Sequence, residues 1–378
     1  MKMRVAFVGT GFTGGGAQHH FARIAPYLCQ QAEYRIAIVL GNIESQYVPP
    51  GLDCVGLGYN GVSDYLLVLY RLWRILKLNR INLIYSISRC PNIVAYCASR
   101  LLRQRPALVL GENTQPIAAY SFKPDVIGRF WLHCQRLMHK RAEVTLCNSE
   151  SCKREMVDGF GVAPNRVHVV GNPVPPSPHF DEGVELHVPP VDPEDILAAS
   201  RLVEGKGLEE LIMAFSRVSK NVNGRLFILG EGPLKAYLES MAQCCGIAER
   251  VIFPGWVENA APWLRRAGLV VHPSHWEGLP NLVLEAMSAG VPVVATNCTS
   301  WIMAFAEERA LKMVAVGDVD EIANAIRYLM ASPYERLDLV KNGRRVAARF
   351  KVEEIIRQRD GYLWEAMRSR NTVVGGIA

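Results

Sequence analysis

The sequence predicts an α/β fold made of two doubly wound, parallel-sheet domains, and two patterns support this. Short apolar runs alternate with longer amphipathic stretches along the 378-residue chain, as they do where strands are joined by helical crossovers. A proline-rich stretch without periodicity, residues 172–195, divides this alternation into two series. We therefore expect one domain over residues 1–175, a linker over 176–195 and a second domain over 196–351.

The first series predicts six strands with helices between most of them. The apolar runs that we assign to strands are 4–8, 34–40, 83–86, 107–110, 144–147 and 167–170. Among the connections, residues 64–80 (DYLLVLYRLWRILKLNR) have the spacing of an amphipathic helix. At 100° per residue its apolar side faces the sheet, and its basic side carries Arg71, Arg74, Lys77 and Arg80 together with Tyr70 and Trp73.

The second series repeats the pattern with clearer turns. We expect strands over 196–199, 225–229, 269–271 and 291–295. A helix begins near Leu208, and the turn GEGP leads into another helix that runs to about Cys245. A third helix begins at about Asn281 and closes at Gly290, because glycine readily takes the left-handed conformation that ends a helix.

The composition indicates an ordinary globular protein of the cytoplasm. Hydrophobic residues make up 49% of the chain, yet no apolar run reaches the roughly 18 residues of a membrane span. The apolar segment at the amino terminus is too short for a signal peptide. The 10 cysteines are scattered and form no set with metal-binding spacing. We expect reduced thiols and no metal site.

The charge is concentrated in the first half. Residues 1–175 contain 20 Lys and Arg against 10 Asp and Glu, a net charge of +10, whereas the remainder has 22 against 26, a net charge of −4. No helix-turn-helix, zinc-finger or RNP-type signature accompanies this charge, so nucleic acid is not the expected partner. The basic aromatic side of 64–80 favours an anionic membrane surface. An ordinary solvated helix face is the alternative.

Charged residues follow two of the predicted strands of the second series. Arg201 and Lys206 follow the strand 196–199, while Glu277 and Glu285 follow the strand 269–271. The carboxyl ends of parallel strands form the ligand-binding edge of such sheets. Cations suit a diphosphate there, and carboxylates can accept hydrogen bonds from sugar and ribose hydroxyls. The pattern therefore predicts a nucleotide-sugar site.

Four elements in one order resemble a known family. They are Arg201-x4-Lys206-Gly, the turn GEGP, Gly255-Trp256-Val257 and Glu277-x7-Glu285, and together they resemble the donor half of the family 4 glycosyltransferases of GT-B fold, over roughly residues 196–300. The resemblance implies two Rossmann-like domains facing each other across a cleft. It also implies that a helix over about 352–370 crosses back to complete the first domain.

The same resemblance implies the activity and the roles of residues. It implies retaining transfer of a hexose or N-acetylhexosamine from a nucleotide-diphosphate sugar, UDP favoured, without metal or other cofactor. Arg201 and Lys206 neutralise the leaving diphosphate and Glu277 binds the sugar. The positions matching donor-binding residues are Gly15, Gly16, Glu112, Asn113, Gly230, Val257, Leu279, Pro280, Asn281 and Glu285. Among these, Glu285 matches the ribose binder and Val257 the residue whose backbone meets the base.

Two positions depart from the family pattern. Gln18 replaces the usual glutamate after the glycine loop, and Glu112-Asn113 stand where many relatives present a histidine to the donor sugar. With Pro280-Asn281, the second departure resembles the subgroup that extends lipid-linked glycans. A glycan or lipid-linked acceptor is therefore expected, and an ordinary loop is the alternative interpretation of Glu112 and Asn113.

Two other functions remain open from the sequence. Gly9, Gly11 and Gly14 form a GxGxxG motif after the first strand, which is typical of a nicotinamide-dependent oxidoreductase. That fingerprint also requires an acidic residue after the second strand, where this chain has Gly41-Asn42. A non-catalytic module that binds nucleotide sugars is the second alternative.

Overall fold

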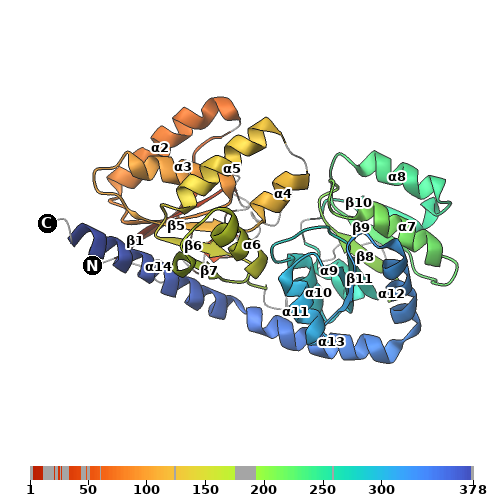
Figure 1. The fold of residues 1–378 in the computed structure, drawn as a ribbon. Coiled ribbons are helices and arrows are strands. Elements are labelled where there is room, and N and C mark those ends of the chain that lie inside the picture. Colours follow the sequence, from red (N-terminus) through yellow and green to blue (C-terminus); the bar gives the residue numbers. More distant parts are fainter. Residues whose placement is uncertain are drawn as a thin grey trace. The chain divides into compact units, whose positions relative to one another are not determined.

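The computed structural model describes residues 3–11, 21, 24–25, 27, 34–43, 48, 52–59, 61–122, 125–174, 193–257 and 259–375. The chain forms two compact units (Figure 1). The first comprises Met1–Pro173 together with Val352–Ala378, and the second comprises Val174–Lys351. The residues between 175 and 192, which include most of the predicted linker, lie outside the described ranges.

The first unit is built on a parallel sheet of 7 strands in the order β3-β2-β1-β4-β5-β6-β7. All six expected strands are present, with small shifts at their ends. The strand that the sequence pattern missed is β3, which has only three residues and no apolar run. The strands are β1 Arg4–Gly9, β2 Tyr34–Val39, β3 Cys54–Gly56, β4 Leu83–Ile87, β5 Ala107–Glu112, β6 Val144–Cys147 and β7 Val167–Val169.

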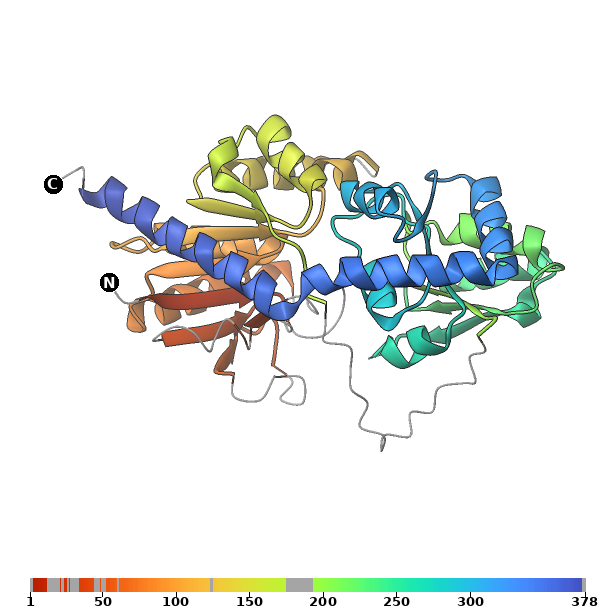
Figure 2. The same cartoon turned by 90° about the horizontal axis from the view of Figure 1, so that it is seen from below.

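Helices cover both faces of this sheet. Helices α2 (Tyr65–Leu78), α3 (Arg89–Arg100) and α5 (Val126–His139) share a hydrophobic cluster with the side chains of one face, including that of Ile84. Successive strand residues point to opposite faces, so Tyr85 points away from these helices. Its hydroxyl accepts a hydrogen bond from Arg359 of α14 (Val352–Gly375), which therefore covers the opposite face (Figure 2).

The other helical segments whose bounds the structure gives for the first unit are short. They are η2 Val62–Asp64, α4 Pro116–Phe122, α6 Glu150–Arg154, η3 Glu155–Gly159 and η4 Pro164–Arg166. The helix expected over 64–80 is α2, two residues shorter at its end, and the terminal helix continues past the expected residue 370. No helix among the described residues is long and apolar enough to cross a bilayer.

The second unit has a parallel sheet of 6 strands in the order β10-β9-β8-β11-β12-β13. Four strands were expected and are present, whereas β10 and β13 were missed. The strands are β8 Ile196–Ala199, β9 Leu226–Leu229, β10 Val251–Gly255, β11 Leu269–His272, β12 Val293–Thr296 and β13 Lys312–Val314.

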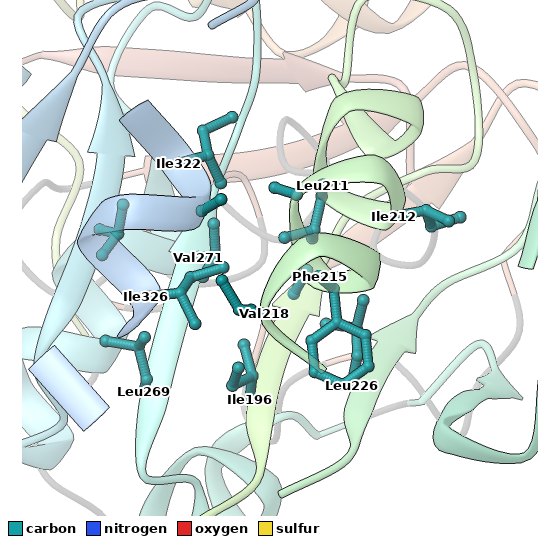
Figure 3. Close-up of a cluster of buried hydrophobic side chains, with 14 of the residues drawn as sticks. Ile196, Leu211, Ile212, Phe215, Val218, Leu226, Leu269, Val271, Ile322 and Ile326 are labelled. Atoms are coloured by element: carbon teal, nitrogen blue, oxygen red, sulfur yellow. The ribbon is translucent and has the colours of Figure 1, made fainter. Parts of the chain in front are cut away.

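Two helices of the second unit pack side by side over the middle of this sheet. In Figure 3, Phe215 and Leu211 of α7 (Leu208–Val218) and Ile326 of α12 (Val319–Ala331) meet Ile196 and Val271 of the strands. Their fully buried apolar side chains make this the main core of the unit. The remaining helical segments are α8 Lys235–Cys244, η5 Ala248–Arg250, α9 Ala261–Arg266, α10 Asn281–Ala289, α11 Ser300–Glu307, α13 Pro333–Ala347 and η6 Ala348–Phe350.

The strand order locates the binding edge of the second sheet. In the second unit the order reverses between β8 and β11, which are paired in parallel with Leu269 beside Ile196. Ligands of doubly wound sheets bind outside the carboxyl ends of the strands where the order reverses. We therefore expect a ligand to bind at the loops that follow β8 and β11.

Candidate active site

A cation and a carboxylate meet where the strand order of the second unit reverses. Lys206 lies in the loop after β8, and Glu277 lies in the loop after β11. Lys206 Nζ and Glu277 Oε1 are 2.6 Å apart, and the side chains are 19% and 22% exposed, respectively. The ion pair is thus held in a largely buried site that still opens to solvent. The sequence predicted both residues but not their direct contact.

The two loops are also joined through their backbones. The His275 N–H donates to the Gly205 carbonyl at 2.9 Å, and His275 Nε2 lies 2.8 Å from Glu210 Oε1 on α7. Gly205 and Gly207 have φ of +82° and +66°, which side-chain-bearing residues rarely adopt. A Cβ on Gly205 would overlap the Trp276 ring, and one on Gly207 would overlap the Pro273 carbonyl. The loops therefore form one packed element.

We expect Gly207→Ala to destabilise the protein by about 2 kcal/mol more than Gly246→Ala, because overpacking against a rigid neighbour typically costs about 1–3 kcal/mol. Gly246 is a matched control, since its φ is +69° but no atom lies within 4 Å of the position of a Cβ. Both variants share the left-handed strain. Denaturant unfolding measures the difference, and equal losses would show that the loops do not pack as described.

Glu277 is surrounded by groups that favour its charged form. Burial alone would raise its pKa, but the charge of Lys206 and the neighbouring His272 lower it, and hydrogen bonds from Lys206 and Ser274 lower it further. The net result is a pKa below the ordinary value for glutamate. Ser274 Oγ donates to Glu277 Oε1 at 3.3 Å, and His272 Nε2 lies 3.7 Å from that oxygen. Glu277 is therefore an anion at neutral pH.

For the other residues predicted at this edge, the structure gives a position and a degree of burial. Arg201 is exposed, and its side chain has no hydrogen bond or ion pair within the described part of the chain. Glu285 lies one turn into α10 and is partly buried. Helix α10 begins at Asn281 behind the buried Leu279 and Pro280, so the N–H groups of its first turn point toward the binding edge. Such N–H groups suit a phosphate.

The turn after β9 lies against the loop after β8. Gly230 has a φ of +128°, and a Cβ there would overlap the Ser200 carbonyl oxygen, so the close approach of the two loops requires glycine. Val257 follows β10 and is partly buried. Because β10, β9, β8 and β11 are neighbours in the sheet, their following loops share one edge. Gly15, Gly16 and the Gly14 of the GxGxxG motif lie outside the described residues.

Glu112 is engaged within the first unit. It is 2% exposed, and its Oε1 accepts from the Asn113 and Thr114 N–H groups and from Thr114 Oγ1, while Gln135 donates to Oε2. Burial raises the pKa of Glu112, although the hydrogen bonds from Thr114 and Asn113 and the charge of Arg89 oppose the rise. The carboxyl group thus fixes the loop after β5. Contact of Glu112 and Asn113 with a donor sugar stays a prediction.

A cavity of about 510 Å³ adjoins this loop. Its lining includes Arg89 at the start of α3, Asn113, and the aromatic side chains of Tyr120 and Trp131. Ser88, also in the lining, has a φ of +82°. Such strain in a residue other than glycine is typical of functional sites.

Four residues at the end of β11 and in the loop that follows it were missed by the sequence analysis. His272 and Ser274 contact or approach Glu277, while His275 and Trp276 join the loop to its neighbour. Their only signal was their position beside Glu277 and directly after a strand. Single histidines and aromatic residues in loops are too common for that signal to identify a role.

Comparisons with known proteins place both units in one family. Residues 193–332 match the profile of "Glycosyl transferases group 1", and residues 14–177 match that of "Glycosyltransferase Family 4". The chain is 24% identical over 294 residues to a Campylobacter jejuni N-acetylgalactosamine-N,N'-diacetylbacillosaminyl-diphospho-undecaprenol 4-alpha-N-acetylgalactosaminyltransferase, covering 75% of this chain and 78% of the relative.

A second relative matches more closely over a shorter stretch. The lipopolysaccharide core biosynthesis glycosyltransferase LpsE of Rhizobium meliloti is 33% identical over 156 residues, which are 41% of this chain and 44% of that protein. The match therefore spans less than half of that relative's length.

Among solved structures, HepE of Anabaena in complex with UDP-glucose superposes with a TM-score of 0.77 at 20% identity, covering 97% of this chain and 100% of that chain. This likeness shows the fold. The family matches also exclude the nicotinamide-dependent oxidoreductase that the glycine motif left open. The chain belongs to the group 1 and family 4 glycosyltransferases and has their GT-B fold.

Proposed function

We propose that this glycosyltransferase moves a hexose or N-acetylhexosamine, with retention, from a UDP-sugar to a glycan or lipid-linked acceptor in lipopolysaccharide or another envelope polysaccharide. The observation that carries the proposal is the Lys206–Glu277 ion pair at the point where the strand order reverses. The names of the Campylobacter and Rhizobium relatives support the acceptor class, and the UDP-glucose complex of HepE supports the donor class.

Different residues of the second unit bind different parts of the donor. Lys206 and Arg201 neutralise the charge that develops on the leaving diphosphate, which stabilises the transition state more than the ground state. With these cations in place the reaction is metal-independent and uses no other cofactor. Glu277 accepts hydrogen bonds from sugar hydroxyls, Glu285 binds the ribose, and the backbone at Val257 meets the base.

The cavity of the first unit is the proposed acceptor site. Arg89 offers a cation, and Trp131 offers a ring face on which a sugar can pack. Near this cavity, α5 exposes Val126, Ile127 and Phe130, which gives the surface an apolar part beside a polar pocket. A lipid-linked glycan has the same two parts.

Binding of nucleotide sugars tests the function. A ligand that binds only the folded protein raises stability by RT ln(1 + [L]/Kd), so thermal unfolding with UDP-, GDP- and ADP-sugars identifies the donor. We expect UDP-sugars to stabilise the protein in the presence of EDTA, and a labelled sugar to be transferred to a lipid-linked acceptor. Binding without transfer to any acceptor would favour the non-catalytic module, and stabilisation by GDP- or ADP-sugars alone would overturn the choice of UDP.

We also propose that the first unit rests on the inner face of the membrane. Helix α2 leaves Leu66, Tyr70 and Leu78 exposed beside the exposed Arg74 and Lys77. Tyr65 at its start lies 6.3 Å, between ring centroids, from Trp131 of α5, so this end of α2, with the exposed Leu66, lies beside α5. Arg71 instead donates to the Leu57 carbonyl at 2.7 Å, which reduces its availability for lipid.

Replacing Arg74, Lys77 and Arg80 together by Glu should abolish sedimentation with phosphatidylglycerol vesicles at low salt. Each basic residue near an anionic surface contributes about 1 kcal/mol, so three account for roughly a 10²-fold change in affinity even before the added repulsion. Changing Arg100, Arg103 and Arg105, which lie at and beyond the end of α3, to Glu alters the net charge equally and should leave binding unchanged. Equal losses in both variants would mean that net charge alone governs binding.

A further inference from the structure

His272 at the end of β11 has a buried nitrogen without a partner. The residue is 4% exposed, and its Nε2 makes no hydrogen bond within the described part of the chain. The nearest carboxylate oxygen given by the structure is Glu277 Oε1 at 3.7 Å, just too far for a hydrogen bond. A buried polar group without a partner is unfavourable and calls for an explanation.

The same Glu277 oxygen is occupied by Lys206. The Lys206 ammonium lies 2.6 Å from Oε1, and Ser274 donates to that oxygen from 3.3 Å. Under the proposed function, however, Lys206 must also serve the donor diphosphate, which carries more negative charge than one carboxylate. When the ammonium turns toward the diphosphate, Glu277 loses its strongest hydrogen-bond donor while it remains largely buried.

We propose that His272 is a positioning residue. When Lys206 turns to the donor diphosphate, His272 Nε2–H replaces it as a hydrogen-bond donor to the Glu277 carboxylate. The inference rests on the proposed function and adds a step to it. A small rotation of the Glu277 side chain closes the 3.7 Å gap, and the carboxylate is then held in place to receive the sugar hydroxyls.

The chemistry of the imidazole suits this exchange. Burial lowers the pKa of His272 to about 4, with Lys206 lowering it further and Glu277 opposing, so the ring is neutral at pH 7. A neutral ring with its proton on Nε2 donates one hydrogen bond and adds no second cation to compete with Lys206 for Glu277. In the ligand-free site the Lys206 ammonium can therefore stay paired with Glu277, while His272 makes no hydrogen bond to that carboxylate.

A double-mutant cycle tests the inference. UDP and UDP-glucose affinities are measured by calorimetry for the parent, His272→Met, His272→Gln, Glu277→Ala and the double variant His272→Met with Glu277→Ala. Met fills a similar volume without a donor, whereas Gln keeps an N–H. We expect His272→Met to weaken UDP-glucose about tenfold, in keeping with a lost hydrogen bond to a charged group, and His272→Gln to recover most of the loss. In the Glu277→Ala background, His272→Met should change nothing further.

Nitrogen-15 NMR gives a second readout, and its main signal is recorded on the parent protein. On saturation with UDP, the Nε2–H signal of His272 should shift as a hydrogen bond to a carboxylate forms, and Glu277→Ala should remove that shift. Equal tenfold losses from His272→Met in both backgrounds, or an unchanged Nε2 signal in a parent that binds UDP, would overturn the inference alone. A parent that binds no uridine nucleotide would overturn the choice of UDP donor and this inference with it.

Discussion

Lys206→Ala is expected to lower kcat by about 10²-fold or more, because a cation that contacts the leaving diphosphate contributes most in the transition state. The assay should contain EDTA so that no divalent metal replaces the missing charge. Arg201→Ala should act in the same direction. Lys341→Ala, in α13 of the same unit, is a control for the loss of one surface cation. Near-normal transfer by Lys206→Ala would remove the proposed electrostatic role.

The same variant should also reveal the ion pair through the pH dependence of its stability. In the parent, the pKa of Glu277 is lowered on folding, so its stabilising contribution is present above the unfolded pKa of about 4.3 and is lost as pH falls through the folded value. Without Lys206 this contribution shrinks. The stability difference between parent and Lys206→Ala should thus be largest at neutral pH and decline in acid, as unfolding titrations can measure.

Glu277→Ala and Glu285→Ala should weaken the binding of different parts of the donor. If Glu285 binds the ribose, its loss weakens UDP and UDP-sugar alike, by roughly tenfold or more for a charged hydrogen-bond acceptor. Glu277→Ala should weaken the sugar-bearing donor or its turnover and leave the affinity for free UDP nearly intact. Calorimetry with both ligands separates the two. Identical losses of UDP affinity in both variants would contradict the sugar assignment of Glu277.

The elements that could be predicted are those whose own side chains carry the signal. Strands such as Ile196–Ala199 are buried and apolar, and the helix Asn281–Ala289 ends at a glycine with φ of +79°. The missed strands lacked such a signal. Lys312–Val314 is an edge strand with two exposed residues, and Val251–Gly255 contains a proline and a register shift. Their place in the sheet depends on neighbours that the local sequence does not reveal.

The charged residues of the site could be predicted from the sequence, whereas the contacts between its side chains could not. A cation and a carboxylate after two strands predicted Lys206 and Glu277, because those residue types suit a diphosphate and a sugar. The 2.6 Å ion pair, the packing of Trp276 on Gly205 and the unpartnered His272 nitrogen depend on how two loops, some 70 residues apart in sequence, lie together. Glu112 shows the same limit, since only the structure reveals how its oxygens are engaged.

The place of α14 in the first unit has a consequence for synthesis on the ribosome. Arg359 is buried against Tyr85 and donates to the Gly171 carbonyl at 2.9 Å, so one face of the first sheet is covered by residues that are translated after the whole second unit. The second unit is contiguous and can fold as soon as it has emerged. Synthesis of the first unit begins earlier, but its last helix is translated after everything else. Until α14 has been made, one apolar face of the first sheet stays exposed, and chaperones can bind it.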